Sequence, residues 1–220
     1  MPEPSLLFAL SEIQALATKA TRGAGFSWGE AEEAGWAVMW LSREGLPGAD
    51  LLLAAIESPE LCAPTPQPFC WRTPGQLCPL RAGMALMDFA ELPSGLANTP
   101  LHLEEVAVPG LLLPFVAQAA HQLAQPLLLH APEMTIVFRT DGAPQSLPAE
   151  LSLNTLHSTT TITLTKAPDF PSAKLPPLTD YFAPLSSSAQ HRLEQLALRT
   201  TVPPSSQSRS RAGASGSDND

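Results

Sequence analysis

The strongest constraint on the fold is the stretch from Ser11 to Gly45, where helix-start, helix-stop and apolar-period signals agree. Two helices joined by a glycine-containing turn are expected there. We expect Ser11 to cap the first helix, because a glutamine three positions later completes a capping box. Ser27 and Glu30 repeat this pattern, so a second helix should follow and run to about Arg43.

The second helix carries two apolar stripes, which predicts that it is buried on two sides. One stripe is aromatic and consists of Trp36 and Trp40. The other is aliphatic and consists of Ala31, Ala34, Val38 and Leu41. One stripe should contact the partner helix and the other should contact the rest of the protein.

The composition limits the function classes. The 220 residues include 24 prolines, so short elements joined by extended segments are expected. A formal net charge of −9 argues against nucleic acid or an anionic membrane as a partner, because both bind basic patches. No stretch approaches the roughly 20 apolar residues of a membrane helix, and the N-terminus lacks the basic region of a signal peptide. Three cysteines, an odd number, predict no disulfide framework and therefore a cytoplasmic location.

After the hairpin the apolar period changes from helical to alternating, with further helices between the strands. We expect helices at 50–57 and 114–125, strands at 83–90, 101–108, 126–130 and 134–140, and a last helix capped within Ser186 to Ser188. Two segments with period-two character predict another pair of strands with a threonine face exposed to water. They contain Leu151, Leu153 and Leu156, and Ile162 and Leu164.

These elements predict an α+β protein in which a helical N-terminal hairpin subdomain packs on a mostly antiparallel sheet. We expect a helical subdomain at 1–58, an α+β core with a C-terminal helix at 59–203, and a tail at 204–220. The proline-rich segment before the last helix should be packed, because it contains large apolar side chains that need burial. These are Phe170, Leu175, Leu178, Tyr181 and Phe182. The tail lacks large apolar residues and is expected to be disordered in isolation.

One candidate for chemistry is a cysteine nucleophile. Cys78 could serve if the fold brought His121 or His130 beside it, because a thiol nucleophile needs a base. The alternative is that Cys78 is an inert core residue and that both histidines are structural. Cys62, Cys70 and Cys78 are eight positions apart, which is not the CxxC spacing of a zinc site. We predict no metal and no cofactor, and GxGxxG, Walker and GxSxG motifs are missing from the sequence.

A second candidate is the tail, whose Arg209 is followed by the acidic end Asp218, Asn219 and Asp220. Such a segment could bind a basic site by folding on contact, either on this protein or on a partner. The alternative is an inert, solubilising end.

The hairpin resembles the N-terminal helical region of the malate/L-lactate dehydrogenase-like family, in which a similar pair of helices leads into a loop with Ser-His-Gly. The corresponding residues here are 45–50, GLPGAD, which contain no histidine. The dehydrogenase activity that the resemblance would imply is therefore not expected.

Nearly the whole chain resembles a bacterial family that is catalogued only as a domain of unknown function. The matching residues are Ser11-Glu12-Ile13, Gly25, Glu32-Glu33-Ala34, Cys78-Pro79-Leu80 with Gly83, Val108-Pro109-Gly110-Leu111, and Val202-Pro203 with Ser208-Arg209, Gly213-Ala214 and Asp218-Asn219-Asp220. This resemblance implies no activity. We expect an accessory or protein-interaction subunit with a protein partner or as a homo-oligomer. The alternative is a small-molecule hydrolase or lyase that uses Cys78 with a histidine, so the sequence leaves open whether the protein is an enzyme.

Overall fold

The computed structural model describes residues 5–58, 60–144, 153–168 and 181–200. Its helices are α1 (Leu10–Gly23), α2 (Trp28–Arg43), α3 (Gly48–Ile56), α4 (Pro79–Asp88), α5 (Leu113–Gln122), α6 (Leu153–His157) and α7 (Ser187–Leu198), with a 3-10 turn at Pro109–Leu112. Its strands are β1 (Ser5–Ala9), β2 (Cys70–Trp71), β3 (Leu101–Val106), β4 (Leu127–Ala131), β5 (Met134–Phe138), β6 (Thr160–Lys166) and β7 (Phe182–Ser186).

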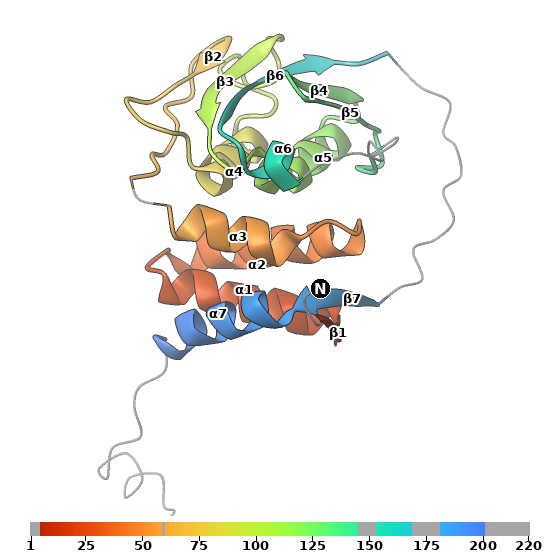
Figure 1. Ribbon diagram of the computed structural model, residues 1–220. Helices are drawn as coiled ribbons and strands as arrows, with labels where there is room; N and C mark the ends of the chain where they lie inside the picture. Colours follow the sequence, from red (N-terminus) through yellow and green to blue (C-terminus); the bar gives the residue numbers. More distant parts are fainter. Residues whose placement is uncertain (1–4, 59, 145–152, 169–180, 201–220) are drawn as a thin grey trace, which may run out of the picture.

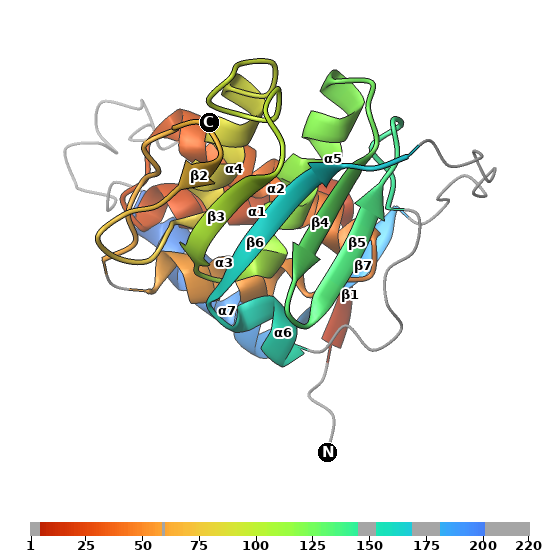
Figure 2. The same ribbon diagram turned by 90° about the horizontal axis from the view of Figure 1, so that it is seen from above.

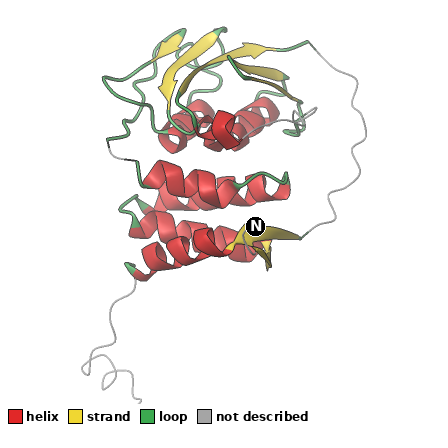
Figure 3. Ribbon diagram, in the orientation of Figure 1, coloured by secondary structure: helices red, strands yellow, loops and turns green. Residues whose placement is uncertain are grey.

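These elements form stacked layers (Figure 1). A five-stranded sheet forms one side of the molecule, and α4, α5 and α6 cover one of its faces. Below them lie α3 and α2, followed by α1 and α7. The helical hairpin of α1 and α2 therefore reaches the sheet through α4 and α5. This segregation of helices from strands (Figure 3) confirms the predicted α+β class.

The sheet has the strand order β2-β3-β6-β4-β5, and only its β2–β3 pair is parallel. The mostly antiparallel sheet is thus confirmed. Viewed from above, no helix of the described residues crosses its outer face (Figure 2). On β6, Ile162 and Leu164 are buried while Thr161 is exposed and Thr163 is half-buried, which confirms the predicted threonine face.

The second predicted capping box is confirmed, whereas the first is wrong. The backbone N–H of Ser27 donates to the Glu30 carboxylate at 2.8 Å, and the Glu30 N–H donates to Ser27 Oγ at 3.3 Å. At α1 the cap is Ala9, not Ser11. Glu12 accepts the Ala9 N–H at 2.9 Å, so an acid in the first turn satisfies the exposed amide two positions earlier than expected.

Both stripes of α2 contact other elements, as predicted. The aliphatic stripe is fully buried, and Trp40 is only 4% exposed. Trp36 is half-buried and meets Phe115 of α5 edge-on, with 5.6 Å between the ring centroids. The aromatic stripe therefore faces the layer that covers the sheet.

The predicted strand at 83–90 is wrong, because residues 83–88 lie in α4 and the last two form a turn. Pro79 occupies the first turn, where its missing N–H costs nothing, and Cys78 precedes it in an extended conformation. Gly83 has a packing role in this helix. A Cβ atom at this position would lie 2.3 Å from the Phe115 ring, so the glycine lets α4 and α5 approach closely.

The prediction of a strand at Leu151 to Leu156 is also wrong for the described residues of this segment, because α6 begins at Leu153. Burial of Leu156 against the 3-10 turn holds this short helix in place. The predicted burial of Tyr181 and Phe182 is wrong as well, since these residues are 76% and 60% exposed. The other members of that prediction, Phe170, Leu175 and Leu178, lie outside the described residues.

The pairing of β1 with β7 was not predicted. β1 pairs antiparallel with β7, with Ser5 opposite Ser186 and Ala9 opposite Phe182. α7 then packs on α1, and Leu193 is buried while Ser186 caps the helix, as expected. The helical layer is thus built from both ends of the described chain. The division into units at 1–58 and 59–203 stays a prediction.

Candidate functional site

Cys78, the proposed nucleophile, is 1% exposed at the start of α4. Burial raises the pKa of its thiol, and the opposing effects of Arg81 and the Leu80 amide are smaller. No hydrogen bond within the described residues joins its sulfur to a histidine. This environment favours the thiol, whereas a nucleophile needs the thiolate.

His121 and His130 lie on different sides of the sheet. His130 is on the outer face of β4, where its Nδ1 lies 2.9 Å from Thr135 Oγ1. His121 is exposed near the end of α5, a helix that packs on the opposite face. The fold does not bring these two candidates together, and neither is paired with Cys78.

The other two cysteines are half-buried and all three are free. Cys70 Sγ donates to Glu104 Oε1 at 3.4 Å, and burial together with this carboxylate raises the pKa of the thiol. Among the described residues, no group of three or more potential ligands is placed to hold a metal ion. Arg209, Asp218, Asn219 and Asp220 lie outside the described residues, and docking of the tail stays a prediction.

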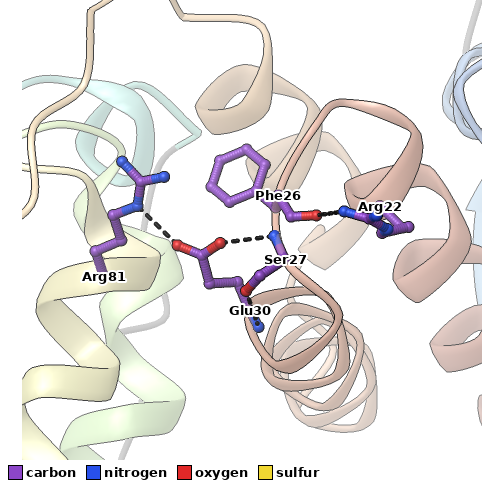
Figure 4. Close-up of polar contacts among 5 residues, drawn as sticks. All are labelled: Arg22, Phe26, Ser27, Glu30 and Arg81. Carbon is purple, nitrogen blue, oxygen red and sulfur yellow. Dashed lines mark hydrogen bonds and ion pairs between the residues drawn. The ribbon is translucent and has the colours of Figure 1, made fainter.

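A polar contact that the sequence did not reveal joins α4 to α2 (Figure 4). Arg81 Nε donates to Glu30 Oε1 at 2.8 Å, and its guanidinium lies 5.3 Å from the centre of the Phe26 ring. On the other side of the turn, Arg22 donates to the Phe26 carbonyl at 2.6 Å and lies over Trp28. Two arginines therefore hold the turn between α1 and α2 in place and connect it to the next layer.

A groove with a volume of about 480 Å³ lies where the helical hairpin meets the layer that covers the sheet. Its lining comes from three elements: Trp36, Trp40, Arg43 and Glu44 of α2; Ala117, Gln118 and His121 of α5; and Asp141, Gly142 and Ala143 of the turn after β5. The volume is within the range of small-molecule sites, which commonly form between structural units and combine apolar walls with a few polar groups.

The turn that forms one wall of the groove is held firmly. Arg139 is buried and forms an ion pair with Asp141, which also accepts the Ala143 N–H at 3.1 Å. Gly142 has a φ of +77°, a conformation that glycine adopts without strain. A Cβ at this position would lie 3.2 Å from the Ala117 carbonyl, so the glycine also allows the turn to approach α5.

The groove continues past Trp36 and Gln118 into a second hollow of about 370 Å³, which has an acidic wall. Glu32 and Glu33 lie there beside Met87. Burial, and then the nearby charges of Asp88 and Glu32, raise the pKa of Glu33. The two ends of the groove thus differ in charge.

A separate apolar surface lies on the β1–β7 pair. It is formed by Leu7 of β1 and Phe182 of β7, which lie on the same face of the pair and are 73% and 60% exposed, with Tyr181, 76% exposed, just before β7. Leu6, 57% exposed, points to the other face of the pair. We call it the β1–β7 surface. This surface was not predicted, because β1 and β7 are far apart along the chain and Tyr181 and Phe182 were expected to be buried.

Comparison with known proteins gives a family match for part of the chain. Residues 8–99, which include α1 to α4 and the Arg81–Glu30 contact, match the model of a family described as Protein of unknown function (DUF3726). The predicted resemblance to a family of unknown function is supported over these residues. No curated protein and no solved structure matches the chain. In the described part, every helix is too short or too polar to span a bilayer.

Proposed function

We propose that this protein is an interaction subunit that associates with a second copy of itself through the β1–β7 surface. The observation that supports this proposal is the exposure of large apolar side chains at the β1–β7 pair, where Leu7 and Phe182 lie on the same face and Tyr181 directly precedes β7. Contiguous apolar patches on soluble proteins commonly mark sites of association.

The free edge of β1 supports pairing between strands. Within the described residues β1 has β7 as its only strand neighbour, so one edge of β1 is unpaired. Every residue of β1 has an N–H group, whereas Pro184 interrupts the donors of β7. The β1 edge is thus the more complete template for another strand.

Charge supports a second copy as the partner. Two copies of a chain with a net charge of −9 repel each other over most of their surfaces. Neither β1 nor β7 contains a charged residue, so contact at this surface brings no like charges together. Antiparallel pairing of β1 with its equivalent would create a closed two-fold interface, the commonest symmetry of soluble oligomers.

The test is the mass of the full chain in solution, measured by sedimentation at several concentrations. Wild type should be a dimer, whereas Leu7→Lys and Phe182→Lys should shift it to monomer. Leu92→Lys is the matched control, because Leu92 is 46% exposed but lies in the turn after α4. A wild type that stays monomeric at about 100 μM, where a dimer with a Kd below about 10 μM would be mostly assembled, overturns the proposal.

An accessory role in the cytoplasm is part of the same proposal. Cys62, Cys70 and Cys78 are all free, which fits a reducing compartment. Fusion to a fluorescent protein and cell fractionation would test this location directly.

A further inference from the structure

The groove between α2 and α5 is separate from the β1–β7 surface and has the features of a binding site in its own right. The half-buried Trp36 supplies an apolar wall, and the turn at 141–143 closes one side. The polar groups of the groove decide which kind of molecule it would bind.

The carboxylates at this end of the groove already have partners within the protein. Glu44 pairs with Arg43 at 3.2 Å. Asp141 pairs with Arg139 and also caps its own turn. Neither acid is therefore left to bind a cationic ligand.

Hydrogen-bond donors, in contrast, remain available. No hydrogen bond of the Gln118 or His121 side chain is found within the described residues. The indole N–H of Trp40, a residue that is only 4% exposed, also has no hydrogen-bond partner among the described residues. Since no buried side-chain nitrogen in the described part lacks a partner, this N–H belongs to the small accessible part of the ring, on the wall of the groove.

We propose that the groove binds a small organic acid with a planar apolar body. The body lies against Trp36, and the carboxylate accepts hydrogen bonds from the Trp40 N–H and from Gln118 and His121. Charged acceptors form stronger hydrogen bonds than neutral ones, so a carboxylate gains more than an amide from these donors. Glu32 and Glu33 at the far end repel the carboxylate and thereby set the orientation of the ligand.

The test uses benzoate as the probe and observes the tryptophan indole N–H signals by NMR. Benzoate should shift the Trp40 signal in a saturable manner at concentrations up to about 20 mM, a range suited to a ligand of this size. Benzamide and benzylammonium, which share the ring but lack the carboxylate, should bind at least about tenfold more weakly, in keeping with the loss of one charge-assisted hydrogen bond.

Two variants decide whether the Trp40 N–H is a ligand contact. Trp40→Phe keeps an aromatic ring but removes the donor, and should weaken benzoate binding about tenfold as followed by the Trp36 signal. Trp28→Phe is the control, because Trp28 is 58% exposed at the start of α2, outside the groove, and its removal should leave the affinity unchanged. Equal binding of benzoate and benzamide, unaltered affinity in Trp40→Phe, or the lack of a saturable shift overturns the proposal.

Discussion

Arg81 of α4 donates from Nε to Oε1 of Glu30 in α2 across 2.8 Å, and this contact links two layers of the molecule. Glu30 also accepts the Ser27 N–H that begins α2. One carboxylate thus caps a helix and anchors its neighbour, so the start of α2 and the position of α4 depend on the same side chain.

Glu30→Gln should lower the free energy of unfolding by about 1 kcal/mol at neutral pH, since it weakens both a cap and an ion pair. Burial by itself raises the pKa of Glu30, but hydrogen bonds from Arg81 and Ser27 outweigh it and leave the pKa below its ordinary value of 4.5. The stabilisation is therefore complete above about pH 4.5 and is lost as the pH falls through the lower, folded-state pKa. Urea unfolding at neutral and acidic pH should show wild type and variant converging in acid.

A suitable control for this prediction is Glu91→Gln, which removes one exposed negative charge in the turn after α4. It should behave as wild type at both pH values. If Glu30→Gln also matched wild type at neutral pH, the contact would have no role in holding the layers together.

Trp40→Ala should cost about 3 to 5 kcal/mol, because the ring is almost completely buried and its removal leaves a cavity. Trp28→Ala on the same helix should cost less than about 1 kcal/mol, since most of that ring is exposed and its contact with Arg22 is at the surface. Denaturant melts of both variants provide the comparison. A Trp40→Ala variant within about 0.5 kcal/mol of wild type would contradict the two-sided burial of α2.

Gly83→Ala should destabilise the protein by about 1 to 3 kcal/mol, because the added methyl group would meet the Phe115 ring. Phe115→Leu alone should also destabilise, through the loss of packing. Combined, the two changes should cost less than the sum of their separate effects by about 1 kcal/mol, since the smaller side chain makes room for the methyl group. Additive effects in this double-mutant cycle would show that the close approach of α4 to α5 is not what requires glycine.

Alkylation should distinguish the three thiols. Cys78 should react most slowly, because it is buried and its thiol pKa is raised. Glu104→Gln should speed the labelling of Cys70 by a factor of about two to ten, since it removes a carboxylate that raises the pKa of this thiol. Glu105→Gln, one position along the chain and exposed, is the matched control. Mass spectrometry of each cysteine over time gives the rates, and fast labelling of Cys78 would revive the nucleophile hypothesis.

Signals that act over a few residues could be predicted from the sequence, and signals that act between distant segments could not. Ser27 and Glu30 lie in the same turn, so their capping box was visible. The role of Gly83 in letting α4 approach α5 involves the Phe115 ring, which is supplied by another element. The spacing of Leu151, Leu153 and Leu156, two and then three positions, fits a strand or a helix, and burial of Leu156 decides between them.

The candidate sites show the same limit. Trp36 and Trp40 were correctly placed on one stripe of α2, but the groove also requires α5 and the turn at 141–143, which the sequence did not bring together. Cys78 was singled out and is buried at the start of α4, yet its neighbour Arg81 was not noticed, because a single arginine in a helix gives no pattern.

The pairing of β1 with β7 also sets the order in which the molecule can assemble. During synthesis β1 emerges early, while β7 and α7 emerge only when nearly the whole described chain has been made. α1 and α2 can pair at once as neighbours, but β1 must wait for a partner strand from the far end, and contacts between distant segments form slowly. Until then both edges of β1 are open, so the late pairing with β7 also removes one of the two strand edges through which nascent chains could associate.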